Sequence, residues 1–268
     1  MKLQNASESA GPCAFGLWRV AVALLADLHS HSCLSPCGSL ELSPRRLLEL
    51  AAARGIQVMA LTDHNSALNC RAFARLCPGF GIIPVFGIEA TTSEEIHALC
   101  LFAELEACLA FGEFAYAALA PFPNNPEKGG DQVYVDEYDN IEGEAEKYLL
   151  GPLALSIEDI GAKAAEYSGL VVPAHVDRPA FSMCSQLGAV TRGPWAALEC
   201  VRIPPAFAGS PLGALGYPLI TSSDAHCPEH VGRRPFWLDA CAEELQPGGP
   251  GSEASLEALR KALAKGRA

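Results

Sequence analysis

Residues 20–31 read VAVALLADLHSH, an apolar run of strand-like composition that ends on two histidines. Five further apolar runs meet a histidine or a carboxylate at one end in the same way. They are VMALTDHN (58–65), IIPVFGIE (82–89), EIHALCLF (95–102), LVVPAH (170–175) and LITSSDAH (219–226). Short apolar runs that alternate with segments of helical period predict βα units and a mostly parallel sheet. We therefore expect an α/β protein whose strand ends carry the chemistry.

Seven candidate strands are spread evenly along the chain, which favours one closed or nearly closed barrel. They are residues 20–28, 56–62, 82–89, 96–102, 170–174, 217–222 and 235–239. Three helices are clearly indicated. The first has Ser43 as its N-cap, and Gly55 follows its end. The second begins after Ser156, and the third covers residues 255–264, where we expect it to pack on the barrel exterior.

The chain reads as one barrel domain over residues 20–268, preceded by an N-terminal extension over residues 1–19. Residues 121–150 interrupt the rhythm with three prolines, a Gly-Gly pair and an acidic stretch. Long irregular insertions in compact domains are usually functional lids or flexible loops. A lid and a solvated surface insertion are both consistent with this composition.

The residues at the strand ends have the chemistry of metal ligands. In a parallel barrel the C-terminal strand ends converge on one rim, where active sites form. Imidazoles and carboxylates together suit Zn, Mn or Fe. A single histidine at a strand end is more often structural than a ligand, but six of the seven histidines lie in these motifs. His230 is the exception, and we expect it in a loop or behind the ligands.

Several residues beside the proposed ligands are candidates for supporting roles. Asp27 and Asp63 are close enough to ligate, but we expect each to orient an imidazole instead. Asp63 or a non-ligating His226 is a candidate acid for the leaving group. Arg178, three residues after His175, is the leading clamp for a phosphate, and a structural salt bridge is its alternative role. Weaker clamp candidates are Arg233 and Arg234.

The overall charge and the cysteines restrict partners and location. A net charge of −12 argues against a long nucleic-acid partner, while a small anion could still bind at local positive centres. The 11 cysteines include no C-x-x-C pair and read as reduced thiols of a cytoplasmic protein. Residues 10–26 are apolar, but they are interrupted by Arg19 and run into the first motif. We therefore expect neither a signal peptide nor a membrane span.

Taken in order, the motifs resemble those of the polymerase-and-histidinol-phosphatase family, called PHP domains, and in particular its small stand-alone phosphoesterases. The resemblance extends from about Asp27 to Asp239 through DLHSH, LTDHN, GIE followed by EIH, PAHVDRP and SSDAH. It implies a distorted (β/α)₇ TIM-like barrel with two to three divalent ions at its rim. The implied ligands form three sets around a bridging Glu89: His29, His31 and Asp224; His97 and His175; and, for a third position, His64 and His226.

One departure from the family pattern concerns the third position. Family members often carry an Asp a few residues after the H-x-H pair, whereas this chain reads SCLSPCGSLE over residues 32–41. Three alternatives remain open: Cys37 takes the place of this Asp as a ligand, Glu41 turns inward to ligate, or the third site is weak or empty. We otherwise expect Cys33, Cys37 and Cys227 to be small apolar fillers.

These observations predict a metal-dependent phosphoesterase that acts on a small phosphate ester: a monoester, a cyclic phosphate or a short nucleotide. Two ions that share a carboxylate can hold a bridging hydroxide, because coordination lowers the pKa of water from about 16 to roughly 7. Glu89, Asp63 and Arg178 are the predicted catalytic residues. Two alternatives remain open: a binuclear amidohydrolase-type enzyme that cleaves a C–N bond or a lactone, and a non-catalytic metal-binding interaction module.

Overall fold

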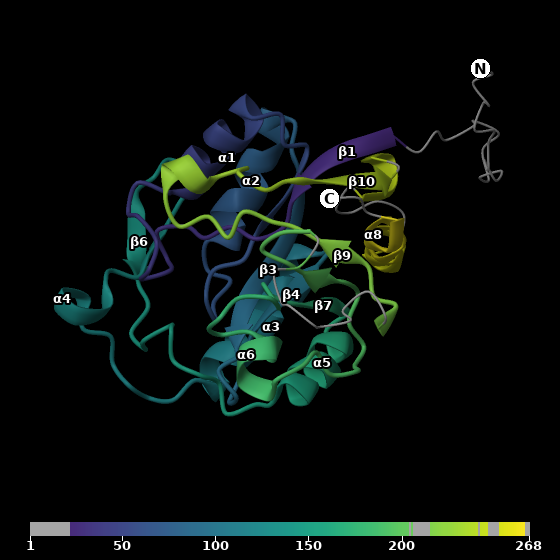
Figure 1. The fold of residues 1–268 in the computed structure, drawn as a ribbon. Coiled ribbons are helices and arrows are strands. Elements are labelled where there is room, and N and C mark those ends of the chain that lie inside the picture. The colour runs from purple at the N-terminus through teal and green to yellow at the C-terminus, as the bar shows by residue number, and fades with distance from the viewer. Residues whose placement is uncertain (1–21, 204, 206–214, 241, 246–251, 266–268) are drawn as a thin grey trace, which may run out of the picture.

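A strongly curved six-stranded sheet forms the centre of the computed structural model, which describes residues 22–203, 205, 215–240, 242–245 and 252–265 (Figure 1). The strand order in this sheet is β10-β1-β2-β3-β4-β7. Its strands are β1 (Val22–Asp27), β2 (Val58–Leu61), β3 (Ile83–Thr91), β4 (His97–Phe102), β7 (Gly169–Pro173) and β10 (Phe236–Ala240). The predicted α/β fold, a distorted TIM-like barrel, is confirmed. The predicted extension over residues 1–19 lies outside the described residues.

The strands depart from a uniformly parallel barrel in two places. β1, β2 and β3 pair in parallel, whereas β4 runs antiparallel to both of its neighbours and β10 runs antiparallel to β1. A separate parallel pair, β8 (Leu198–Glu199) and β9 (Leu219–Ile220), completes the rim. Single bridges join Trp195 to Val171 and Ala225 to Ser30, so the segments around β8 and β9 lie between β7 and the end of β1.

Successive residues along a strand face opposite sides of the sheet, and each side has its own apolar layer. On β2, Met59 and Leu61 belong to the outer layer, which the helices cover, while Val58 and Ala60 belong to the inner layer. Val85 lies four residues before Glu89 on β3, and Leu99 lies two residues after His97 on β4; both belong to the inner layer. The period of two therefore places Glu89 and His97 on the inner face as well. The alternation therefore directs these two polar side chains to the barrel interior.

Helices surround this sheet and are positioned by signals in the sequence. Ser43 caps α1 by accepting a hydrogen bond from the Arg46 N–H, and Ser156 forms a capping box with Asp159 at the start of α5. The helices are α1 (Pro44–Ala53), α2 (Cys70–Phe80), α3 (Leu105–Ala118), α4 (Pro126–Gly129), α5 (Ile157–Glu166), α6 (Met183–Leu187), the short 3₁₀ helix η2 (Pro228–His230), α7 (Ala242–Leu245) and α8 (Ser252–Lys265).

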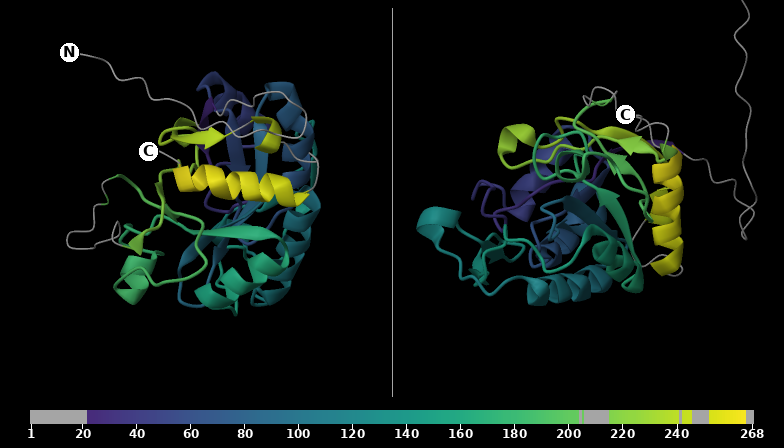
Figure 2. Two further views of the ribbon diagram at one scale, coloured as in Figure 1. Left: turned by 90° about the vertical axis from the view of Figure 1, so that its right-hand side faces the viewer. Right: turned by 60° about the horizontal axis from the view of Figure 1, so that its bottom comes forward.

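The C-terminal helix α8 occupies a different place from the exterior position that the sequence suggested. It contacts both β10 and β7, the two edges of the six-stranded sheet, and lies across the opening between them (Figure 2). Leu259 and Leu263 are buried in the inner apolar layer with Leu238 of β10. The open side of the sheet therefore supplies the apolar surface that this amphipathic helix buries. Within the described residues, no helix has the length and apolar character needed to cross a membrane.

The insertion over residues 121–150 contains α4 and a small hairpin of β5 (Val133–Val135) and β6 (Ile141–Glu144). Buried amides tie it to the barrel. The Asn69 side chain accepts a hydrogen bond from the Val135 N–H at 2.9 Å, and the Asn65 side chain donates to the Leu149 carbonyl at 2.7 Å. Val133 and Val135 pack against Cys33, so the insertion rests on the loop that follows β1.

Candidate metal centre

The eight predicted metal ligands converge at one rim of the barrel. Six of them follow the ends of β1, β2, β7 and β9, and Glu89 lies within β3. His97 differs, because it is the first residue of its strand. Since β4 runs antiparallel to β3, its first residue lies beside the C-terminal half of β3, where His97 pairs with Thr91. The reversed strand explains why this motif begins with its histidine while the others end with theirs.

The carboxylate of Glu89 lies at the centre of the cluster and is surrounded by five imidazoles. Glu89 is 1% exposed, so both of its oxygens are inside the barrel rim. Oxygen Oε1 lies 2.9 Å from His97 Nδ1, 3.1 Å from His175 Nε2 and 3.2 Å from His29 Nε2. Oxygen Oε2 lies 3.2 Å from His64 Nδ1 and 3.3 Å from His31 Nε2. One carboxylate thus touches imidazoles from four strand ends.

Asp224 supplies a second carboxylate on the other side of the H-x-H pair. Its Oδ1 lies 3.4 Å from the Nε2 atoms of both His29 and His31, and 3.4 Å from His226 Nδ1. Asp224 has a φ of 48° and His175 a φ of 30°, a left-handed region that non-glycine residues rarely adopt. Such backbone strain concentrates at functional sites, where surrounding contacts hold it in place.

The donor atoms fit a divalent cation. Three groups have ligand atoms within 4.8 Å of one another: His29, His31, Glu89 and Asp224; His64, Glu89 and His97; and His31, His64 and His226. Within the described residues, several buried atoms of the cluster have no hydrogen-bond partner: His64 Nδ1, Glu89 Oε2, His97 Nδ1, His175 Nδ1 and Asp224 Oδ1. Buried polar atoms without partners are costly, and a cation would satisfy them.

The histidines of the cluster differ in the direction in which their pKa values are shifted. Burial lowers the pKa of His29, but Glu199, Glu89 and Asp224 outweigh it and raise the pKa well above its usual value. Burial also lowers the pKa of His31, but the adjacent carboxylates of Asp224 and Glu89 outweigh it and raise this pKa to about 9. Burial, assisted by the charge of His31, lowers the pKa of His226 to about 4. Burial also lowers the pKa of His64, so this outer pair is neutral at pH 7.

Glu199 is a supporting carboxylate that the sequence analysis missed. Its Oε2 lies 3.0 Å from His29 Nδ1 and accepts a hydrogen bond from the His175 backbone N–H at 2.8 Å. It therefore orients one imidazole and stabilises the strained backbone of another. A carboxylate behind a ligating histidine fixes its tautomer and ring orientation. The signal was present, because PWAALE (194–199) is also an apolar run that ends on a carboxylate.

Asp63 lies behind the ligands and acts on them through a serine. Its carboxylate accepts hydrogen bonds from the Ser32 N–H at 2.7 Å, the Ser32 hydroxyl at 2.6 Å and the Ser35 hydroxyl at 2.7 Å. The Ser35 oxygen is 3.1 Å from His31 Nδ1. When the Ser35 hydroxyl donates to Asp63, its oxygen can accept a hydrogen bond from the imidazole. This arrangement orients His31 and occupies both oxygens of Asp63.

Asp27 orients a loop rather than an imidazole. It is fully buried and accepts hydrogen bonds from the backbone N–H groups of Ser223 at 2.9 Å and Gly232 at 3.1 Å. Ser223 directly precedes Asp224. Asp27 therefore holds the loop that carries the second carboxylate of the cluster, and the prediction that it orients an imidazole is wrong.

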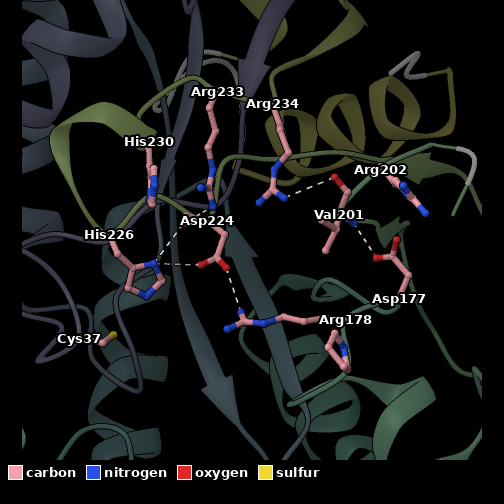
Figure 3. Close-up of a pocket in the computed structure, with 11 residues that line it drawn as sticks. Cys37, Asp177, Arg178, Val201, Arg202, Asp224, His226, His230, Arg233 and Arg234 are labelled. Atoms are coloured by element: carbon pink, nitrogen blue, oxygen red, sulfur yellow. Dashed lines mark hydrogen bonds and ion pairs between the residues drawn. The ribbon is translucent and has the colours of Figure 1, made fainter. Parts of the chain in front are cut away.

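A cavity of about 690 Å³ opens beside Asp224 (Figure 3). Its charged lining consists of Arg178, Arg202, Arg233, Arg234, Asp177 and Asp224, with His226, His230 and Cys37 nearby. The Arg178 guanidinium approaches from one side and contacts Asp224 Oδ2 at 3.1 Å, so the predicted clamp also forms a salt bridge. Arg233 and Arg234 approach from the opposite side (Figure 3). We refer to this space as the arginine cavity.

The residues considered for the third position lie in different places. Cys37 lines the arginine cavity together with His226 and Asp224. Glu41 is exposed and lines a separate groove between the loop after β1 and the β5–β6 hairpin. Of the two proposed substitutes for the missing Asp, only Cys37 lines the same cavity as His226.

Comparison with known proteins gives one family and several structures of the same fold. Residues 27–149 match the family model described as the PHP domain. An uncharacterized protein of Methanocaldococcus jannaschii is 32% identical over 136 residues, which cover 44% of this chain and 79% of that protein. A two-domain protein from Bacteroides vulgatus, described as containing a predicted PHP-like metal-dependent phosphoesterase, is 16% identical with a TM-score of 0.51. That match covers 98% of this chain and 67% of the Bacteroides chain.

The lesion-specific endonuclease Q of Pyrococcus furiosus has the same fold and corrects one expectation. It is 18% identical with a TM-score of 0.57 over 91% of this chain, and this chain spans 56% of its length. Endonuclease Q has also been solved with a 27-mer duplex that carries an abasic lesion at its active site. The exclusion of long nucleic acids was therefore wrong. It rested on net charge, whereas phosphates are bound by local cations, and four arginines line one cavity here.

Proposed function

Because the chain belongs to the PHP domain family, we propose that it is a metal-dependent hydrolase whose substrate is a phosphate ester. The observation that carries this proposal is the single carboxylate of Glu89, within 2.9–3.3 Å of five imidazoles. A buried site of this composition has few structural uses, since each imidazole there lacks the solvent that its charge would need. Its donors match those of borderline divalent ions such as Zn, Mn and Fe.

We assign the ligands to two ions that share Glu89. The first set is His29, His31 and Asp224, and the second is His97 and His175. The contacts of both sets with Glu89 support its assignment as the bridge. His64 and His226 are assigned to a third position, which their approach to His31 supports. Bound divalent ions would supply Lewis acidity, which lowers the pKa of water and neutralises phosphate charge.

The residues behind the ligands hold them in place. Glu199 holds His29, and Ser35 with Asp63 holds His31, so both members of the H-x-H pair have a fixed orientation before a substrate arrives. Because both oxygens of Asp63 already accept hydrogen bonds, we assign it to orientation rather than to proton donation. His226 is 27% exposed at the cavity, but it is assigned to the third metal position and its lowered pKa leaves it neutral at pH 7, so we assign no donor for the leaving-group proton.

The arginine cavity supports a phosphate ester over an amide or a lactone. A neutral carbonyl substrate gains little from cations beside the metals, whereas a phosphate carries negative charge that several guanidinium groups can share. The Arg178 side chain is 41% exposed, so it can contact a substrate oxygen while it pairs with Asp224. A monoester, a cyclic phosphate, a short nucleotide and a nucleic-acid strand all carry this charge.

The test is a substrate panel on metal-loaded protein, with metal content measured in the same samples. We expect two to three ions of Mn, Zn or Fe per chain, and turnover of p-nitrophenyl phosphate or bis(p-nitrophenyl) phosphate that is lost in the metal-free protein. p-Nitroacetanilide and a simple lactone are the matched carbonyl substrates. Turnover of these alone would favour the amidohydrolase alternative. Full phosphatase activity in metal-free protein would refute the proposal.

A further inference from the structure

The groove between the loop after β1 and the β5–β6 hairpin differs in charge from the arginine cavity. Its volume is about 430 Å³, and it shares no described lining residue with the arginine cavity. Among the described residues that line it there is no lysine, arginine or histidine, but there are four carboxylates: Glu41, Asp131, Asp139 and Glu144. We refer to this space as the acidic groove.

The negative charge of the acidic groove is largely unbalanced. Residues 129–146, which include the hairpin, carry seven carboxylates and no lysine, arginine or histidine. In the part of the chain that the structure describes, one of the four groove carboxylates has a cationic neighbour, since Asp139 Oδ2 lies 3.8 Å from Arg45 Nε. Unpaired charge of one sign attracts a partner of the opposite sign.

The acidic groove also exposes apolar side chains. Leu40, on the loop after β1, is 55% exposed, and Ile141, on β6, is 67% exposed. Val133 and Val135 are buried against Cys33 and line the same groove. Contiguous exposed apolar side chains with polar residues around them are typical of surfaces that bind other proteins.

A β-bulge brings the apolar and acidic side chains of β6 to one face. Val133 pairs with Glu144, and Val135 pairs with Ile141, so β6 has one residue more than β5 over this stretch. Residues three positions apart on a regular strand would face opposite sides of the hairpin. The extra residue of the bulge therefore allows Ile141 and Glu144 to line the same groove.

The strand β6 also has a free edge. Among the described strands it pairs with β5 alone, and it lies at the periphery of the molecule (Figure 1). Three of its four residues are exposed: Ile141, Glu142 and Glu144. The backbone groups at the edge of such a strand can pair with an extended segment of another chain.

We propose that the acidic groove binds a basic, extended segment of a partner protein. Lysine or arginine side chains of that segment contact the carboxylates, and its apolar side chains cover Leu40 and Ile141. The charge argues against a nucleic acid at this place, because phosphates would meet four carboxylates. A polyamine would neutralise the carboxylates but would leave the apolar side chains and the edge of β6 uncovered. The inference does not depend on the proposed function, since the acidic groove contains no proposed metal ligand.

Calorimetric titration with three blocked heptapeptides tests the two properties of the segment. A lysine–valine peptide has both, a lysine–serine peptide keeps only the charge, and a glutamate–valine peptide keeps only the apolar side chains. We expect the lysine–valine peptide to bind at least about tenfold more tightly than the lysine–serine peptide, the gain from burying one apolar side chain. The glutamate–valine peptide should not bind. Equal affinity for both lysine peptides, or no binding of either, would overturn the proposal.

Two variants of exposed residues locate the binding on the protein. We expect Glu144→Gln to weaken binding of the lysine–valine peptide about threefold, as for the loss of a surface ion pair, and Ile141→Ser to weaken it about tenfold. Glu158→Gln is the matched control for charge, because Glu158 is exposed on α5, outside the lining of the groove. Equal weakening by Glu158→Gln and Glu144→Gln would show that the peptide follows net charge, and the proposal would fail.

Spermine distinguishes a protein segment from a small cation. We expect spermine to bind at least about tenfold more weakly than the lysine–valine peptide, because it gains no apolar contact, and its affinity to be unchanged in Ile141→Ser. Tighter binding of spermine than of the peptide would assign the acidic groove to a polyamine instead. These measurements need no turnover, so they decide the inference whether or not a phosphate ester is hydrolysed.

Discussion

The histidine cluster and the arginine cavity share Asp224 but are built in different ways. The cluster residues lie at strand ends, are largely buried, and are held by carboxylates such as Glu199 and by Ser35. The cavity residues lie on loops after β7, β8 and β9, and backbone carbonyls hold two of its guanidinium groups. Buried hydrogen bonds therefore hold the cluster in place, whereas the cavity lining contains more arginines than carboxylates. The comparison suggests a division between the chemistry and the recognition of the substrate.

Removing the charge of Glu89 is the strongest test of this division. Glu89→Gln keeps the size of the side chain but leaves the five surrounding imidazoles without their shared anion. We expect loss of at least one ion per chain and a fall in kcat of at least about 10³-fold, the order found when a central electrostatic contact is removed. Metal analysis and phosphatase assays measure both.

The arginine cavity provides the contrast for that variant. Inorganic phosphate should bind metal-free Glu89→Gln within about threefold of metal-free wild type, because Glu89 does not line the arginine cavity. If anion binding falls together with metal binding, the two regions act as one site and the division is wrong.

Glu199 tests the comparison where the two regions meet, because it contacts His29 and lies three residues before Arg202. Glu199→Gln retains an oxygen that can accept the His175 N–H, so the fold should survive. We expect metal affinity to fall by about 10–100-fold, as is typical when a group behind a metal-binding histidine is changed. Competition with a metal chelator measures the affinity. Unchanged affinity would show that Glu199 serves only the backbone of His175.

The positions of most strands of the central sheet, and the convergence of the eight proposed ligands at one rim, could be predicted from the sequence for a physical reason. A period of two combined with a polar terminus determines both the strand and the face on which Glu89 lies. Glu199 was missed because its strand has only two residues, too short for a periodic signal. Ser35 was missed because a serine acts here only through its tertiary partners, Asp63 and His31.

The arginine cavity was predicted only in part. Arg178 was selected for its distance of three residues from His175, and Arg233 and Arg234 were ranked as weaker candidates. No pattern connects Arg202 to them, because β8 and β9 come together only when the barrel closes. For the same reason, the sequence could not show that α8 packs against the inner apolar layer. An amphipathic period shows that a face is buried, but not which side of the sheet buries it.

Asn69 tests whether the insertion over residues 121–150 braces the site or acts as a lid, one of the two roles that its composition allowed. Its side chain donates to the Ser32 hydroxyl at 2.8 Å and accepts from the Val135 N–H, so it links the insertion to the loop that carries Ser35. For a brace, Asn69→Ala should lower the free energy of unfolding by about 1–3 kcal/mol, because buried partners lose their hydrogen bonds. Urea denaturation measures this change.

The control for that variant is Asn140→Ala, at the exposed end of the hairpin, where the side chain contacts Asp136. We expect it to change stability by less than about 0.5 kcal/mol. If Asn69→Ala instead leaves stability unchanged and alters kcat and KM together, the insertion moves during turnover and the lid interpretation is favoured.

The smallest predicted effect is a pH dependence of the metal-free protein. The pKa of His31 is raised to about 9 in the folded state, against an ordinary value of 6.5. A raised pKa means that the folded state binds the proton more tightly than the unfolded state does. The resulting stability is fully present below pH 6.5 and is lost as the pH rises through 9.

Metal-free protein should therefore melt several degrees lower at pH 9.5 than at pH 6.5, and His31→Gln should reduce this difference. Metal affinity should change in the opposite direction, because the ion binds the neutral imidazole and must displace this proton. Thermal melts at both pH values, with and without Mn²⁺, measure the two trends in one experiment. A metal-free protein with the same melting temperature at both pH values would show that His31 is neutral before the metal arrives. The histidine cluster would then be preorganised for its ions in protonation as well as in geometry.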